Sequence, residues 1–311
     1  YLAPARLRDN LEIRANTSVQ RQLIADGRCT GVEVEYADGS RQTLNAKLVV
    51  LSAGAIMSPT VMLRSGIGPA AELQALGIDV HRDIAGVGKN LCDHPALSVV
   101  CNVHDSQLID HDAPLIQTIL RYTAEGSDKR NDLQIEQLSF AGRPGQGPRF
   151  AIAAVLEYQY GRGELRLRSA DPNDAPIIDN RFCEDPTDAQ RLASCVRDTL
   201  AFTRKGELAD MISDISFPDP ERGHDEETLI ALCRRFSGSG YHPSGTLKMG
   251  PASDPGAVVD QYGCAHAIEQ LVVADASIMP SVPRANTNLT SIMIGEKIGD
   301  WLRQQPGHYG L

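Results

Sequence analysis

Leu48-Val49-Val50-Leu51-Ser52-Ala53-Gly54-Ala55 sets four apolar residues directly before four small ones. A short unbroken apolar run is typical of a strand buried on both faces, as in a parallel sheet. The small residues after it predict a tight turn, where a backbone can approach a flat or charged ligand closely. We expect a helix to follow from Ser58-Pro59, with Ser58 as the N-cap and Pro59 at the first helical position.

The rest of the chain adds a second apolar strand and several antiparallel ones. Leu271-Val272-Val273-Ala274 repeats the unbroken apolar pattern, so parallel-type strands are expected near both ends of the chain. Alternating residues and Asp-Gly turns predict antiparallel strands, the later ones with one wet face, at residues 11–14, 18–24, 31–36, 42–44, 150–159 and 163–168. Helices are expected at residues 188–205, 226–236 and 290–303, whereas residues 98–150 show no clear period. The expected fold class is α+β, that is, mixed α/β.

The composition is that of an ordinary globular chain, with 42% hydrophobic and 23% charged residues among 311. Thirty basic and forty acidic residues give a net charge of −10, and no basic cluster interrupts that balance. No nucleic-acid partner is therefore expected. No apolar run approaches the roughly 18 residues that cross a bilayer, and residues 1–6 lack the sections of a signal peptide. The chain does not begin with Met, so we expect it to begin inside a longer protein.

The cysteines are dispersed, and no two stand at C-x-x-C spacing. Their spacing suggests neither a zinc site nor a disulfide framework, so no metal is expected. The odd number is typical of a reducing compartment, and we expect a cytoplasmic location. The seven are Cys29, Cys92, Cys101, Cys183, Cys195, Cys233 and Cys264.

Three loop motifs could carry chemistry, and each also has a plain structural interpretation. His242 lies in an irregular segment rich in Gly, Pro and Ser, where catalytic groups often gather, although it could simply hold the loop by local hydrogen bonds. Asp275-Ala276 ends a buried strand and could offer a carboxylate and a backbone N–H to a ligand, or cap the next helix. Asn286 and Asn288 precede an apolar helix, and Asn288 could be its N-cap.

Five segments together resemble the glucose–methanol–choline (GMC) family of flavin-dependent oxidoreductases. Residues 54–68 resemble the second signature of the family at every defined position. Gly86-Val87-Gly88-Lys89-Asn90-Leu91-Cys92-Asp93-His94-Pro95 resembles its V-G-x-N-L-x-D-H-P segment. The other matches are residues 163–188 with the start of its C-terminal domain, 242–250 with H-x-x-G-T-x-x-M-G, and 275–297 with D-A-S-I-M-P through N-x-N to E-K. The segments stand in the order of the family across nearly the whole chain.

The resemblance implies a fold and a reaction. The fold would be the remainder of a Rossmann-like FAD-binding domain (residues 1–97 and 231–311) plus an antiparallel-sheet substrate domain (residues 98–230). The reaction would be oxidation of a primary or secondary alcohol, a small-molecule substrate, to a carbonyl compound. His242 would take the hydroxyl proton while FAD accepts a hydride, and Asn286 would hold the alcohol oxygen. With Asn at position 286, the partner position of His242, the chain most resembles the members of the family that oxidise choline and those that oxidise aryl alcohols or hydroxymethylfurfural. Sugars are less expected as substrates.

The same matching assigns contacts with FAD. Asp275 and Ala276 would lie along the ribityl–pyrophosphate part. Asn288 and Thr290 would lie near the isoalloxazine ring. The adenosine end would be approached by Val19, through its backbone, and by Ala53 and Gly54.

One family element is absent from these 311 residues, the strand–G-x-G-x-x-G–helix that binds the pyrophosphate. We therefore expect the partner to be an N-terminal segment of the same protein or a second chain, without which this chain would not hold FAD. Three alternatives remain: a non-catalytic or cleaved fragment, a member of the fold with lyase or decarboxylase chemistry, and, more distantly, a nicotinamide-dependent dehydrogenase.

Overall fold

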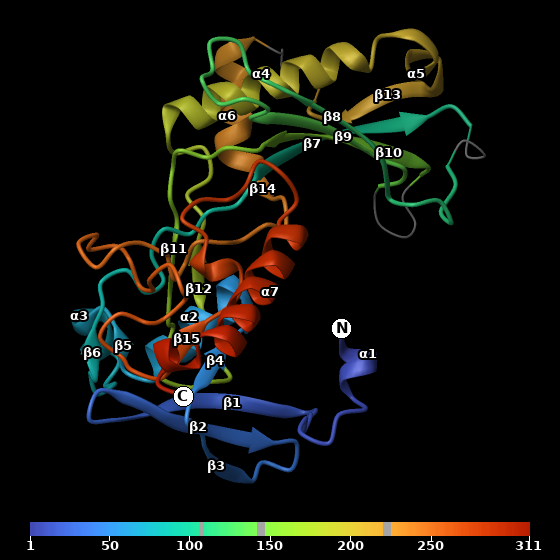
Figure 1. Cartoon of the computed structure of the whole chain (residues 1–311). Coiled ribbons are helices and arrows are strands. Elements are labelled where there is room, and N and C mark those ends of the chain that lie inside the picture. Colours follow the sequence, from blue (N-terminus) through green and yellow to red (C-terminus); the bar gives the residue numbers. More distant parts are fainter. Residues whose placement is uncertain (106–108, 142–146, 220–224) are drawn as a thin grey trace.

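The computed structural model describes residues 1–105, 109–141, 147–219 and 225–311. An upper sheet covered by helices stands above a lower part built on a three-stranded meander, with loops between them (Figure 1). The first elements are α1 (Leu2–Ala5), β1 (Thr17–Ala25), β2 (Arg28–Tyr36), β3 (Arg41–Asn45), β4 (Val49–Leu51), α2 (Gly54–Arg64), β5 (Ile67–Gly68), α3 (Ala70–Ala75), β6 (Arg82–Asp83), β7 (Pro95–Val103), β8 (Ile116–Tyr122), β9 (Leu133–Leu138) and β10 (Arg149–Leu156). The later ones are β11 (Glu164–Arg166), β12 (Ile177–Asp179), α4 (Pro186–Phe202), α5 (Gly206–Met211), β13 (Ile212–Phe217), α6 (Glu226–Phe236), β14 (Gly238–Ser239), β15 (Leu271–Val273), η3 (Ala276–Ile278), α7 (Asn288–Gln304) and η4 (Pro306–Tyr309).

The meander of β1, β2 and β3 is antiparallel throughout. Its turns fall at Asp26-Gly27 and Asp38-Gly39, where both glycines take positive φ values that Gly adopts without strain. These three strands confirm the expectation from alternation and turn residues. The strand expected at residues 11–14 is wrong, because that segment pairs with no strand and is exposed.

The two apolar strands near the ends of the sequence pair with each other. β4 and β15 are parallel, with Val49 opposite Leu271 and Leu51 opposite Val273. Helix α2 then begins at Gly54, five residues before the expected first helical position, Pro59, so the prediction of Ser58 as its N-cap is wrong. The carboxylate of Asp275, which follows β15, accepts the Gly54 N–H at 2.9 Å and stabilises the early start.

Pro59 consequently lies inside α2, and the structure compensates for its missing N–H. In an α-helix the N–H of residue 59 would donate to the carbonyl of Ala55. The hydroxyl of Thr246, which is fully buried, donates to that carbonyl at 2.6 Å instead. The helix therefore depends on a residue of the distant 242–250 segment to satisfy its backbone.

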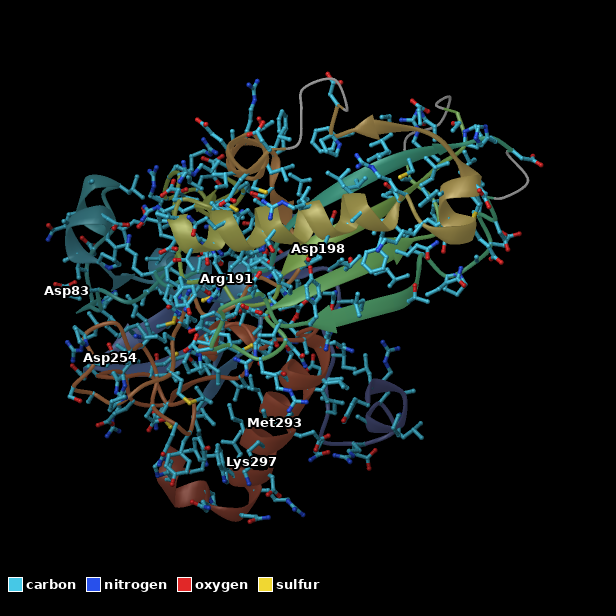
Figure 2. The ribbon with its side chains drawn as sticks, turned by 90° about the horizontal axis from the view of Figure 1, so that it is seen from above. Asp83, Arg191, Asp198, Asp254, Met293 and Lys297 are labelled. Atoms are coloured by element: carbon cyan, nitrogen blue, oxygen red, sulfur yellow. The ribbon has the colours of Figure 1, made fainter. Side chains whose placement is uncertain are left out.

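The upper sheet has the order β13-β7-β10-β9-β8, and β14 adds to β7. Helix α4 packs across it, with α6 beside α4, and Figure 2 shows from above how α4 crosses the strands. The expectation of one wet face is wrong for β10, since seven of its eight residues are buried. This strand is central in the sheet. Helix α4 covers one of its faces, and the loops between the sheet and the lower part lie on the side of the other face (Figure 1). β8 is an edge strand whose first five residues are exposed.

Two hydrophobic clusters organise the interior. One lies between the upper sheet, α4 and α6, and the other joins α2, β4, β15 and α7 below. Leu165 of β11 and nearby Leu167 belong to the lower cluster. The domain division at residues 97 and 230 stays a prediction. Among the described residues, no helix has the length and apolarity that a bilayer crossing requires.

The last helix is confirmed, although its start differs by two residues from the prediction. α7 begins at Asn288, and its N-cap residue is Thr287, which makes no side-chain capping bond. The alternative reading of Asn288 as the N-cap is therefore wrong.

Candidate active site

Two loops from distant parts of the chain meet at a buried carboxylate, Asp93. Its Oδ1 accepts the backbone N–H groups of His94 at 2.7 Å and His242 at 2.9 Å, and its Oδ2 accepts the Ser239 hydroxyl at 2.5 Å. Asp93 is 2% exposed, and burial raises the pKa of its carboxyl. A Cβ on Gly240 would lie 2.8 Å from the His94 carbonyl oxygen, so the loops approach as closely as Gly allows. Asp93 thus ties the His242 loop to the segment that enters β7.

A chain of hydrogen bonds fixes which nitrogen of His242 carries a proton. His94 Nε2 lies 3.0 Å from the carbonyl oxygen of Pro283, which can only accept, so this nitrogen is protonated. His94 is fully buried, and burial together with the neighbouring His242 lowers its pKa to about 3, so its Nδ1 is an acceptor at pH 7. His242 Nδ1, 2.9 Å away, must then donate to it. His242 Nε2 is therefore unprotonated, and its lone pair can accept a hydrogen bond or a proton.

Asn286 faces that lone pair. Its Nδ2 lies 3.3 Å from His242 Nε2, and its Oδ1 accepts from the Arg121 guanidinium at 3.3 Å. Burial lowers the pKa of the half-buried His242, with the Asp93 charge opposing this and the Arg121 charge adding to it. A histidine with a pKa below 6.5 is neutral at pH 7, the state in which Nε2 can accept a proton.

Glu157 lies beside His94 and is 1% exposed. Its Oε1 is 3.7 Å from His94 Nδ1, and its Oε2 has no hydrogen-bond partner in the described part of the chain. Burial raises the pKa of Glu157 to about 7; Arg121 opposes that rise and Glu136 adds to it. A buried carboxyl that titrates near neutral pH therefore lies next to the histidine pair.

Asp275, expected to offer its carboxylate to a ligand, uses both oxygens inside the fold. Oδ2 accepts from the Gly54 N–H and from the Ser58 hydroxyl at 2.5 Å. Oδ1 accepts the N–H of Ser277 at 2.8 Å and its hydroxyl at 2.5 Å. The structure thus joins Asp275 to Gly54, and Asp275 can approach a cofactor through its backbone.

In the part of the chain that the structure describes, no hydrogen bond joins the other expected cofactor residues to His242 or Asn286. Ala53 is exposed, and the Cβ position of Gly54 faces open space. Asn288 is exposed and Thr290 half-buried in the first turn of α7, and Ala276 begins η3. Val19 of β1 accepts a bond from Arg64 of α2 through its carbonyl. The structure thus brings two pairs of predicted residues into direct contact, Gly54 with Asp275 and His242 with Asn286.

Sequence reasoning missed four residues of the site: Asp93, His94, Arg121 and Glu157. Asp93-His94 stand in the segment 86–95 that resembles the family, and this motif was the available signal. Arg121 lies in the stretch without period, and Glu157 directly follows β10, within the segment 150–159 that was expected to have one wet face. No local pattern pointed to either.

Comparison with known proteins places this geometry in a family context. Models described as GMC oxidoreductase match residues 1–96 and 159–295. The chain is 36% identical to 5-(hydroxymethyl)furfural oxidase of Methylovorus sp., over 97% of this chain and 59% of that protein. It is 34% identical to human mitochondrial choline dehydrogenase (98% and 56%) and 35% identical to choline oxidase of Arthrobacter globiformis (91% and 54%). The chain thus spans a little over half the length of these relatives.

Solved structures agree in fold. Pyridoxine 4-oxidase from Mesorbium loti superposes with a TM-score of 0.86 at 24% identity, covering 97% of this chain and 60% of that one. A fungal aryl-alcohol oxidase gives a TM-score of 0.76 at 24% identity, covering 93% and 60%. At these identities the likeness establishes the fold.

Proposed function

The chain belongs to the GMC oxidoreductases, and from that membership we propose that it supplies the catalytic part of an enzyme that oxidises a primary or secondary alcohol to a carbonyl compound with FAD. The lone pair of His242 Nε2, held 3.3 Å from the Asn286 amide, carries the proposal. We assign the complete activity to this chain together with a further segment of the same protein or a second chain.

The residues present fit the reactive half of FAD. Small, exposed residues end β4, and a Cβ on Gly54 would meet open space, so a planar ligand can approach the backbone. The 17-residue helix α7 has no side-chain cap at its N-terminus, which suits an electron-rich edge of the ligand. We propose Asn288 and Thr290 beside the isoalloxazine ring. The remaining contacts of this proposal are Asp275 and Ala276 along the ribityl–pyrophosphate part and Val19, Ala53 and Gly54 near adenosine.

His242 and Asn286 divide the work on the alcohol. The substrate hydroxyl would donate to His242 Nε2 and accept from Asn286 Nδ2, which replaces their present direct contact. His242 then removes the hydroxyl proton, a contribution typically of about 10² to 10⁴ in rate. Bound FAD would supply the acceptor for the hydride of the carbinol carbon. His94 acts by position, because its Nδ1 acceptor keeps the His242 proton on Nδ1 and Nε2 free.

The charge near Asn286 bears on the substrate class. Relatives include enzymes named for hydroxymethylfurfural and for choline. Arg121 lies one hydrogen bond from Asn286, and a guanidinium there repels a quaternary ammonium group. We therefore favour a neutral alcohol of the aryl or furfuryl type, with choline second.

The exposed apolar residues of the lower part support the proposed partner segment. Val50 of β4 is 43% exposed, and Leu289 and Met293 on α7 are 77% and 54% exposed. A further part of the same protein, carrying the pyrophosphate loop, would cover these faces. All seven cysteines lie in the described residues and are free thiols, which supports the proposal of a reducing, cytoplasmic location.

The test is the visible spectrum of the full-length protein before and after anaerobic addition of benzyl alcohol, hydroxymethylfurfural, choline or glucose. We expect flavin bands that bleach with a neutral aromatic alcohol. His242→Ala should bind flavin but bleach at least about 100-fold more slowly. His104→Ala, at an exposed histidine, is the matched control.

Other outcomes would support the alternatives. A flavin-containing protein that no alcohol bleaches would contradict alcohol oxidation and favour lyase or decarboxylase chemistry on the same fold. A full-length protein that stays colourless after addition of FAD would indicate a non-catalytic role.

A further inference from the structure

A cluster of metal-ligating side chains joins the loop at residues 260–264 to η4. The C-terminus, which follows η4, lies in the lower part of the molecule (Figure 1). Asp260, Cys264 and His308 each offer one donor atom, and the three atoms lie within 4.8 Å of one another. The Asp260 and His308 side chains are 33% and 37% exposed, and Cys264 is the one cysteine of the seven that is not buried. A cation from solution can therefore reach all three.

Hydrogen bonds and ring contacts orient two of these ligands. Asp260 Oδ1 accepts the N–H groups of Tyr262 at 2.8 Å and Cys264 at 2.9 Å, which leaves Oδ2 towards His308 Nε2, 4.0 Å away. The ring of Tyr262 packs on that of His308 with centroids 4.2 Å apart, and the Tyr309 hydroxyl donates to the Tyr262 carbonyl. The loop at residues 260–264 and η4 thus face each other through polar groups.

A cavity adjoins the cluster and gives room for a solvent ligand. Its volume is about 610 Å³, and Cys264 and His308 are among the residues that line it. A site with three protein ligands and an adjoining water matches an open four-coordinate centre.

We propose that Asp260, Cys264 and His308 bind a divalent cation of borderline softness, Zn²⁺, with a water molecule from the cavity as fourth ligand. A thiol and an imidazole select this class over Mg²⁺ and Ca²⁺, which prefer oxygen alone. Tetrahedral Zn²⁺ holds such atoms roughly 3.3 to 3.8 Å apart, so the donors must close by about 1 Å, which rotation of the exposed His308 side chain allows. Binding releases the thiol proton to solvent and fastens η4 to the 260–264 loop.

The test measures metal in the full-length protein, independently of any flavin chemistry. After chelation and dialysis against Zn²⁺, we expect about one zinc per chain, and less than about a fifth of that in Cys264→Ser and in His308→Ala. Co²⁺ in place of Zn²⁺ should give a thiolate-to-cobalt charge-transfer band that Cys264→Ser removes. His104→Ala, an exposed histidine outside the cluster, should bind as the unmodified protein does.

Absence of stoichiometric zinc from the unmodified protein, or its retention in either variant, overturns the proposal. If a variant fails to fold, the cobalt spectrum of the unmodified protein decides. Because the other six cysteines of residues 1–311 are buried, a charge-transfer band from residues of this part of the protein supports ligation by Cys264, and the absence of a band overturns the proposal.

Discussion

At the scale of single residues, the protonation of His242 depends on groups from separate elements. Asp93 precedes β7, Arg121 belongs to β8, and the fully buried His94 fixes the tautomer of His242. Burial lowers the pKa of His242, and in the proposed mechanism its neutral form is the base. Activity should therefore be full at neutral pH and be lost as the pH falls below 6.5.

Arg121→Gln tests this dependence. Removing the guanidinium removes a charge that lowers the pKa of His242, so that pKa should rise and the acid limb of kcat/KM should move to higher pH. The loss of the hydrogen bond to Asn286 should also lower the maximum value of kcat/KM. Arg130→Gln, on the exposed surface, should leave the limb in place. A limb that is unmoved in Arg121→Gln would contradict the assigned electrostatics.

Glu157 makes a prediction about stability. Its pKa rises from 4.5 to about 7 on burial, so the folded state binds the proton more tightly than the unfolded state does. Stability from this group is present below pH 4.5 and is lost as the pH rises through about 7, by about 3 kcal/mol in total. Glu157→Gln should therefore raise the unfolding free energy at pH 8 and change it little at pH 5.

Urea unfolding of the full-length protein at both pH values measures this difference. Glu227→Gln, on the exposed first turn of α6, is the control and should show a similar effect at both. Equal effects of Glu157→Gln at pH 5 and pH 8 would sink the assignment of a raised pKa.

At the scale of elements, α2 and the 242–250 segment depend on each other through Thr246. Thr246→Val should leave the Ala55 carbonyl without its donor and cost about 1 to 3 kcal/mol. Pro59→Ala restores an N–H for that carbonyl, so the cost of Thr246→Val should be smaller in the Pro59→Ala background. Thermal or urea unfolding of the four proteins of this cycle gives the coupling energy.

Thr60→Val is the matched control for that cycle. The Thr60 hydroxyl donates to the Ile56 carbonyl at 2.6 Å, but that carbonyl also has the helical N–H of residue 60 as a donor. Thr60→Val should therefore cost less than Thr246→Val. Additive effects of Thr246→Val and Pro59→Ala would contradict the exchange of donors.

The same elements show how far the sequence could predict the structure. The meander and α6 were predictable because Asp-Gly turns and helical capping act within a few residues. The start of α2 was not, because Asp275, 221 residues away, holds Gly54. His242 and Asn286 were identified as a pair through the family motifs. The tautomer of His242 was not predictable, since it depends on contacts with His94 and Pro283 that no local pattern encodes.

At the scale of the whole molecule, β4 and α7 expose large apolar side chains in the lower part: Val50 on β4, and Leu289, Ile292 and Met293 on α7, the helix on which Met293 and Lys297 are labelled in Figure 2. Residues 1–311 produced alone should therefore bind a hydrophobic dye and unfold over a broad range, whereas the full-length protein should do neither. FAD added to residues 1–311 should remain unbound. A stable, yellow, monomeric preparation of these residues would refute the need for a partner segment.

The pairing of β4 with β15 also has a consequence in time. Val49 and Leu271 are opposite each other although 222 positions separate them. At about 5 to 20 residues per second, a ribosome completes β15 roughly 10 to 45 s after β4 has been made. During that interval β4 has no β15 to pair with, and α2 has neither Asp275 at its first turn nor Thr246 at Ala55. The nascent chain should hence gain protease resistance in the 48–64 region late in synthesis, and chaperones that hold apolar segments have their longest opportunity to bind there.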